Sequence, residues 1–204
     1  MTGPVRARAE SLAKLVELLV FPSYCRLCRE ILDEPGERIV CHACLARLSP
    51  HKGFVCPVCG RFHESPGEAH LCRRCLEARP AFSVHRSCGS YGGALKDVIL
   101  LFKYRKYAPL SGPLARFAEL SLGSEARLWE GVDFLVPVPL HPSRRRGRGF
   151  NQSRLLARAL AKQRGLKVLR GALVKTRNFP PQAGLRAADR ERNGVGAYAV
   201  RRPG

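Results

Sequence analysis

Four short segments decide how the first 80 residues of this 204-residue chain fold, and each places two cysteines three positions apart. They are Cys25-Arg-Leu-Cys28, Cys41-His-Ala-Cys44, Cys56-Pro-Val-Cys59 and Cys72-Arg-Arg-Cys75. Twelve residues separate the first pair from the second, eleven the second from the third, and twelve the third from the fourth. Two thiolates at this spacing can reach one tetrahedral metal ion from a tight turn, and a second such turn completes the coordination. The spacing therefore predicts two structural Zn²⁺ sites.

The spacing leaves two ways to join these segments. Near-equal gaps fit two successive zinc ribbons, and they fit nearly as well a cross-braced arrangement that joins the first segment with the third and the second with the fourth. Sequential pairing is favoured because the two halves are similar and each can then fold around its own ion. Four cysteines per ion leave no open coordination position, so catalysis at the metal is not expected. The ligands of the two ions are then Cys25, Cys28, Cys41 and Cys44, and Cys56, Cys59, Cys72 and Cys75.

Disulfide bonds are the main alternative for these cysteines, but they need an oxidising compartment. The first ten residues carry no apolar segment of the kind that directs export, and a cytoplasmic location is the expectation. Four copies of a thioredoxin-like redox pair would be redundant. The ninth cysteine, Cys88, has no paired partner and is expected to be a small buried residue or a free thiol. Four nearby histidines are expected at the surface, namely His42, His51, His63 and His70.

The charge of the chain is large and unevenly placed. Lys and Arg total 36 against 16 Asp and Glu, for a formal net charge of +20. Residues 134–204 hold 17 of the basic residues and two acids, Asp189 and Glu191, which gives +15 in that part. This asymmetry indicates contact with a polyanion or a phosphorylated ligand. The competing interpretation is that these arginines are simply solvated.

Composition and periodicity divide the chain into three parts. Apolar residues at helical spacing predict an amphipathic helix within 1–21, which ends at Pro22. The double zinc ribbon is expected over 22–80, and a second domain over 81–204.

Strand and helix signals alternate in the second domain. A strand is expected over 81–91, helices over 95–102 and 112–122, a buried strand over 134–140, and a helix that opens at 150–153. This alternation predicts an α/β domain with a mainly parallel sheet and flanking helices.

A basic loop is expected between the last strand and the last helix. The segment from His141 to Gly149 contains four arginines and two glycines, and Asn151 or Ser153 could cap the following helix. Backbone N–H groups and a helix N-terminus in this arrangement can bind phosphate. Neither a P-loop nor a dinucleotide-binding motif occurs.

Taken together, the motifs resemble those of the ComF family of competence proteins. The resemblance rests on the cysteine pairs and on five further segments: Phe102-Lys-Tyr104, Val136-Pro-Val-Pro-Leu140, Arg148-Gly-Phe-Asn-Gln152, Lys175-Thr-Arg177 and Arg192-Asn-Gly-Val-Gly-Ala-Tyr198. It implies an N-terminal double zinc ribbon followed by a phosphoribosyltransferase fold, and it supports sequential pairing of the cysteine segments.

The resemblance also implies a substrate and its site. The substrate would be phosphoribosyl pyrophosphate with Mg²⁺, and Gln182 would orient the acceptor or a loop. The expected substrate-binding residues are Lys103, Arg148, Gly149, Asn151, Gln152 and Gln182. A part in DNA uptake during transformation is implied as well.

One element of the family pattern is absent from this sequence. Family members continue into a strand with two adjacent acids and a Thr-Thr-Gly turn that holds the ribose 5-phosphate. The chain reaches Gly204 without it, and Asp189-Arg-Glu191 lies in a different context. The expectation is therefore a C-terminally truncated domain that lacks this strand and loop, is inactive as an enzyme, and would bind phosphoribosyl pyrophosphate and Mg²⁺ only when complete.

Two other functions remain open from the residues alone. A chain of this charge with zinc ribbons could bind single-stranded DNA without being an enzyme, although few aromatic side chains lie beside the basic residues for base stacking. It could also dock onto a competence helicase. The residues do not identify an acceptor substrate or an oligomeric state.

Overall fold

The structure is a computed structural model that describes residues 22–32, 38–63, 67–179 and 194–201, together with residues 186, 189 and 192. The helix predicted within 1–21 and Gln182 lie outside the described residues. Within these ranges, every helix is too short or too polar to span a bilayer. In chain order the elements are α2 (His42–Ala46), α3 (Arg73–Glu77), α4 (Gly93–Tyr104), η1 (Ala108–Leu110), α5 (Ser111–Leu122), α6 (Ala126–Trp129), β1 (Phe134–Leu135), α7 (Pro142–Arg148), α8 (Gln152–Arg164), β2 (Lys167–Val168), β3 (Leu173–Lys175) and β4 (Tyr198–Val200).

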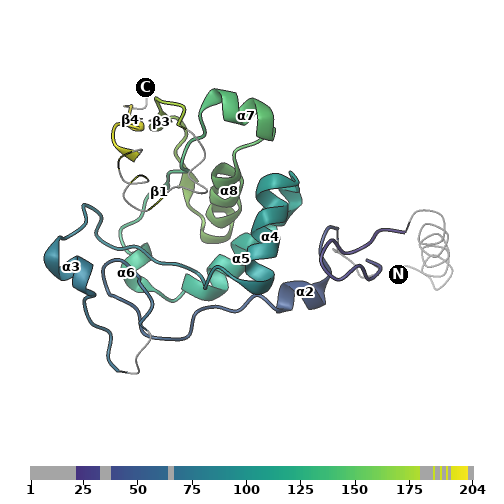
Figure 1. The fold of residues 1–204 in the computed structure, drawn as a ribbon, viewed down its shortest axis with the longest axis horizontal. Helices are drawn as coiled ribbons and strands as arrows, with labels where there is room; N and C mark the ends of the chain where they lie inside the picture. The colour runs from purple at the N-terminus through teal and green to yellow at the C-terminus, as the bar shows by residue number, and fades with distance from the viewer. Residues whose placement is uncertain are drawn as a thin grey trace.

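Three long helices, α4, α5 and α8, form the centre of the molecule, with α2 and α3 on opposite sides of them (Figure 1). α5 packs against α8, and η1 contacts both α4 and α5. The helices predicted over 95–102 and 112–122 are confirmed. α4 buries Val98 and Phe102, and α5 buries Phe117, so the apolar spacing in the sequence marked residues that face the core.

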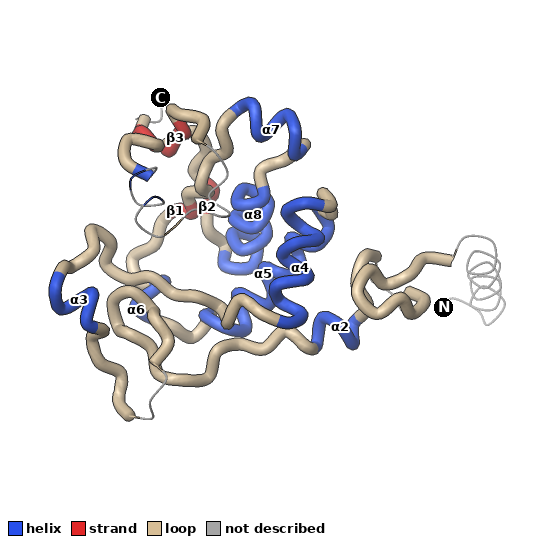
Figure 2. Tube along the Cα trace, in the orientation of Figure 1, coloured by secondary structure: helices blue, strands red, loops and turns tan. Residues whose placement is uncertain are grey.

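The strands form two small sheets. β1 and β2 pair in parallel, with Phe134 opposite Lys167, and β2 contacts α8 (Figure 2). β3 and β4 pair antiparallel, with Leu173 opposite Val200. The predicted mixture of helices with a parallel sheet is therefore present, although the parallel sheet has only two strands within the described residues.

Two strand predictions were wrong. Residues 81–91 contain no strand, because their backbone bonds elsewhere: the N–H of His85 donates to the carbonyl of Val58 at 2.8 Å. The strand expected over 134–140 ends after two residues, since Pro137 and Pro139 have no N–H to donate to a ladder. It is also not buried, because Phe134 is 48% exposed.

The basic loop expected between His141 and Gly149 is largely a helix, α7, and this prediction was also wrong. His141 caps it through Nδ1, which accepts the N–H of Ser143 at 3.4 Å, and Pro142 occupies the first turn. Proline favours this position because the N–H it lacks would have no partner within the helix. Gly149, with φ of +81°, ends the helix.

Arg164, at the end of α8, holds three helices together. Its Nε and Nη2 donate to the two carboxylate oxygens of Glu119 on α5, both at 2.8 Å. Nη2 also donates to the carbonyl of Gly123 at 2.8 Å, and the guanidinium lies 3.7 Å from the ring centroid of Trp129 on α6. Arginine's planar fork suits this set of contacts, which a lysine cannot reproduce.

We expect Arg164→Lys to lower the free energy of unfolding by about 1.5–3 kcal/mol, because the two-point contact with Glu119 and the stacking on Trp129 are lost while the charge remains. Urea denaturation followed by circular dichroism measures the change. The matched control is Arg73→Lys, since Arg73 pairs with Glu77 on the surface at 2.7 Å with 91% of its side chain exposed. That change should cost at most about 0.5 kcal/mol, and equal losses for the two variants would contradict the role assigned to Arg164.

Candidate functional site

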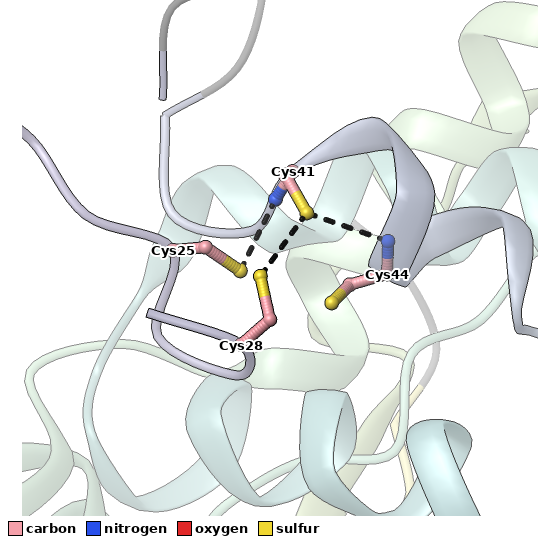
Figure 3. Close-up of side chains that lie close together, drawn as sticks. All are labelled: Cys25, Cys28, Cys41 and Cys44. Carbon is pink, nitrogen blue, oxygen red and sulfur yellow. Dashed lines mark hydrogen bonds between the residues drawn. The ribbon is translucent and has the colours of Figure 1, made fainter. Parts of the chain in front are cut away.

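The eight paired cysteines form two compact clusters, and the pairing is sequential. One holds Cys25, Cys28, Cys41 and Cys44, the other Cys56, Cys59, Cys72 and Cys75, and the sulfur atoms within each cluster lie within 4.8 Å of one another. The cross-braced alternative is therefore excluded. Figure 3 shows the first cluster, in which side chains from a tight turn and from the start of α2 converge. Four sulfurs in this arrangement fit Zn²⁺, which prefers tetrahedral thiolate sites.

Backbone hydrogen bonds shape the turn that presents the first two sulfurs. The N–H of Cys25 donates to the carbonyl of Glu30 at 2.8 Å, and the N–H of Arg29 returns to the carbonyl of Cys25 at 3.0 Å. Arg29 has a φ of +71°, a left-handed conformation that favours glycine. On the other side of the site, Cys41 caps α2 and accepts the N–H of Cys44 on its sulfur at 3.4 Å.

The second site repeats this geometry with every ligand 31 positions later in the chain. The N–H of Cys56 donates to the carbonyl of Arg61 at 2.9 Å, and the N–H of Gly60 to the carbonyl of Cys56 at 2.9 Å. α3 follows Cys72 just as α2 follows Cys41. The two ribbons are therefore structural copies, as the similarity of the two halves predicted.

Donated hydrogen bonds favour the thiolate form of one cysteine in each site. Burial raises the pKa of Cys25, but N–H groups that include that of Cys41, 3.4 Å away, outweigh it and lower the pKa to about 6. Cys56 has the same environment and the same pKa of about 6. For Cys44 and Cys75, burial and neighbouring sulfurs raise the pKa to about 12. A bound cation would be needed for all four thiolates of a site to coexist, and its binding would release protons.

The two ribbons join the rest of the molecule differently. Cys25, Cys41 and Cys44 belong to the same apolar cluster as Val98 and Phe102 of α4, so the first ribbon is part of the main core. The second has a separate small cluster around its own buried cysteines.

The second ribbon is held to the helices mainly by polar contacts. Arg86 pairs with Glu125 at 3.0 Å and donates to the carbonyl of Pro57 at 3.2 Å, while His85 bonds to the carbonyl of Cys59 at 3.0 Å. Sequence reasoning missed Arg86, and no motif marks it.

The remaining histidines and the ninth cysteine lie outside the two clusters. His42 and His70 are exposed as expected, but His51 and His63 are half-buried, and His51 stacks on Phe62. Cys88 is half-buried, and burial raises its pKa, which leaves it a poor nucleophile.

The structure brings together five of the six residues expected to bind substrate. Gln152 is buried, and its Nε2 donates to the carbonyl of Lys103 at 3.2 Å. Asn151 caps α8 and also donates through Nδ2 to the carbonyl of Val138 at 3.0 Å. Arg148 lies over the ring of Tyr104, 5.6 Å from its centroid. The ends of α4 and α7 thus meet the beginning of α8.

Lys175 on β3 lies near Arg148, although it was not among the expected binding residues. Burial and the positive charges of Arg144 and Arg148 lower its pKa. Its place in Lys175-Thr-Arg177, one of the segments that match the family pattern, is the signal that could have identified it.

We expect two zinc ions per chain, and different consequences when each site is broken. Cys56→Ser should remove one ion and unfold the second ribbon locally, because that ribbon has its own small cluster. Cys25→Ser should remove one ion and also weaken the helical core to which Cys25 belongs. Structural zinc contributes on the order of 10 kcal/mol to a domain of this kind. Elemental analysis, with hydrogen exchange on α4, measures both effects. A chain purified anaerobically that holds no zinc, or equal loss of α4 protection in the two variants, would contradict this account.

Gly60 should tolerate no side chain. Its φ is +65°, and a Cβ atom would collide with the carbonyl oxygen of His85. Gly131 is the matched control, since its φ is +68° but nothing lies within 4 Å of an added Cβ. Gly131→Ala should cost only the left-handed strain, about 1–2 kcal/mol. Gly60→Ala should cost more in urea denaturation and release one zinc ion at a lower chelator concentration. Equal effects would show that the approach of His85 is unimportant.

Comparison with known proteins gives two matches. A family model described as a double zinc ribbon domain matches residues 16–76. Competence protein F of Haemophilus influenzae is 27% identical over 127 residues, which cover 61% of this chain and 56% of that protein. The matched part thus spans little more than half the length of this curated relative. No solved structure matches the chain.

These matches agree with the geometry. The double zinc ribbon model covers all eight clustered cysteines. Together with the two four-cysteine clusters, the matches show a double zinc ribbon and a likeness to Competence protein F over 127 residues.

Proposed function

We propose that this chain is a ComF-like protein linked to DNA uptake, and that its part after the ribbons has a phosphoribosyltransferase-like organisation. In this proposal Lys103 and Arg148 bind the diphosphate group of phosphoribosyl pyrophosphate. The link to DNA uptake rests on the name of the relative, Competence protein F.

The observation that carries the proposal is the hydrogen bond between Gln152 and the carbonyl of Lys103, at 3.2 Å. It joins two segments that match the family pattern and lie 49 positions apart in the chain. Because Gln152 is only 6% exposed, this contact is a fixed part of the fold rather than a surface encounter. The backbone of Lys103 is thereby held against the start of α8, and Arg148 lies beside it over the ring of Tyr104, so we call this place the junction.

The chemistry of this junction suits a diphosphate. Transfer from phosphoribosyl pyrophosphate breaks an anomeric C–O bond, and negative charge grows on the departing pyrophosphate. The Lys103 ammonium and the Arg148 guanidinium would neutralise that charge, and backbone N–H groups near Gly149 would add hydrogen bonds. Like-charged neighbours favour anion binding here, since Lys175, Arg144 and Arg148 repel one another until an anion lies among them.

The donor set at the junction contains cationic and amide groups, which are not ligands that Mg²⁺ prefers. Mg²⁺ would therefore arrive bound to the diphosphate, where it would offset part of the negative charge. The sequence contains only two threonines, Thr2 and Thr176, and so no Thr-Thr-Gly turn for the 5-phosphate. In these 204 residues the proposed contacts address the diphosphate end of the ligand alone.

This leads to a specific expectation for binding. The zinc-loaded chain should bind pyrophosphate and phosphoribosyl pyrophosphate with similar, weak affinity in the presence of Mg²⁺, because only the shared diphosphate is held. Lys103→Gln and Arg148→Gln should each weaken both ligands by about ten-fold, and the chain should not turn over phosphoribosyl pyrophosphate. Isothermal titration calorimetry measures the affinities.

The control variant is Lys96→Gln, which removes an exposed lysine from the same helix as Lys103. Unchanged affinity in the Lys103 and Arg148 variants would move the diphosphate away from this junction. Much tighter binding of phosphoribosyl pyrophosphate than of pyrophosphate would mean that other groups hold the sugar phosphate.

A further inference from the structure

A second basic site lies beside the junction, in a cleft of about 510 Å³ between α8 and β3. Three arginines line it, Arg145 from α7 and Arg154 and Arg158 from α8. Its other walls are apolar and include Leu140, Leu155 and Leu173. Clefts of this size, with apolar walls and a few convergent polar groups, are typical of small-molecule sites.

Arg154, which lines this cleft, has an unsatisfied donor. Its Nε is buried and has no hydrogen-bond partner. A buried donor without a partner carries a desolvation cost that native structures avoid unless a ligand or water meets it. Arg154 is therefore one of the groups that a ligand in the cleft would meet.

The positive charges around Arg154 are not balanced. Repulsion from Arg158, then burial, then repulsion from Arg170 and Arg145 lower the pKa of Arg154. Among the residues that the structure describes, no carboxylate forms an ion pair with Arg145, Arg154 or Arg158. On α8, Arg154 and Arg158 are four positions apart, a spacing at which like charges destabilise a helix. Repulsion among these arginines lowers the stability of the ligand-free chain, and an anion bound in the cleft would offset that repulsion.

We propose that this cleft binds a small phosphorylated molecule of the nucleotide class, with its phosphate on Arg145, Arg154 and Arg158 and its ring against the apolar wall. Guanidinium groups donate two parallel hydrogen bonds to phosphate oxygens, so three of them can hold one phosphate group from several sides. The apolar wall distinguishes the site from a surface that contacts phosphate alone, and favours a ligand with a planar or apolar part.

This cleft adjoins the diphosphate site proposed above and uses other cationic side chains. Both include Gly149 and Asn151, but the cationic side chains differ: Lys103 and Arg148 belong to the junction, while the cleft has the three arginines. The two proposals can therefore fail independently.

The test titrates adenosine monophosphate, adenosine and inorganic phosphate into the full zinc-loaded chain by calorimetry at low salt. Adenosine monophosphate should bind at least about ten-fold more tightly than either adenosine or phosphate, because it alone engages both walls. Arg154→Gln and Arg158→Gln should each weaken it by about ten-fold or more. Arg154→Lys should restore little, since lysine keeps the charge but not the fork. Arg127→Gln is the control, as Arg127 is exposed on α6.

A second readout separates ligand binding from a structural role. Without ligand, Arg154→Gln should raise the melting temperature, because it removes repulsion with Arg158, Arg170 and Arg145. A structural arginine would instead lower the melting temperature when replaced. Pyrophosphate binding at the junction should stay unchanged in the same variant.

Three results would overturn the proposal. The first is unchanged affinity for adenosine monophosphate in both glutamine variants, and the second is equal binding of adenosine and adenosine monophosphate. The third is binding of a single-stranded oligonucleotide through Arg154 and Arg158 without binding of the mononucleotide, which would make the cleft part of a nucleic-acid surface.

Discussion

In each ribbon, two cysteine pairs that lie far apart in the sequence must coordinate the same metal ion. The fold of the N-terminal part depends on this constraint. Regular structure there is sparse: each ribbon has one isolated β-bridge and one five-residue helix within the described residues. Such elements cannot hold a chain in place by backbone hydrogen bonds alone, because helices of this length are unstable in isolation. Bringing four sulfurs within 4.8 Å of one another fixes the path of the chain instead. Since three of those sulfurs also pack in the core with Val98 and Phe102, the first metal site positions the helices as well.

The two ribbons show that local geometry and tertiary attachment have different causes. Cysteine spacing determines the turn and the short helix, and these repeat in both halves. Attachment depends on the residues that come after each ribbon. The first leads into apolar residues such as Leu45 and Leu48, which pack against the core, whereas the second leads to Arg86 and its polar contacts with Glu125 and Pro57. Two ribbons with the same local geometry thus differ in attachment. The first packs into the main apolar core, whereas the second has its own small cluster and is joined to the helices mainly by polar contacts.

The structural features that could be predicted from the sequence are those that depend on short, local patterns of residues. The two metal sites, α4, α5 and the Asn151 cap of α8 follow from spacing, apolar periodicity and capping chemistry. α7 escaped prediction because its segment, rich in arginine and glycine, has no apolar face, and its helical start depends on His141 as an unusual cap. The strand over 81–91 failed because its backbone bonds elsewhere, as His85 does to Val58, and the strand over 134–140 stops early because Pro137 and Pro139 have no N–H to donate. The junction of Gln152 with Lys103 is likewise non-local, and only the family resemblance linked the two segments beforehand.

Basic side chains in this chain have at least two different surroundings that net charge cannot distinguish. Arg86 and Arg164 each meet a carboxylate and join elements that would otherwise separate, so their charge is used within the fold. Arg154 lies among other cations instead, and repulsion from Arg158 together with burial lowers its pKa, while burial and the charges of Arg144 and Arg148 lower the pKa of Lys175. Repulsion of this kind reduces the stability of the empty chain, and an anion in contact with these groups relieves it. This is the physical basis of the two anion sites proposed above, which include Arg148 and Arg154 of residues 134–204.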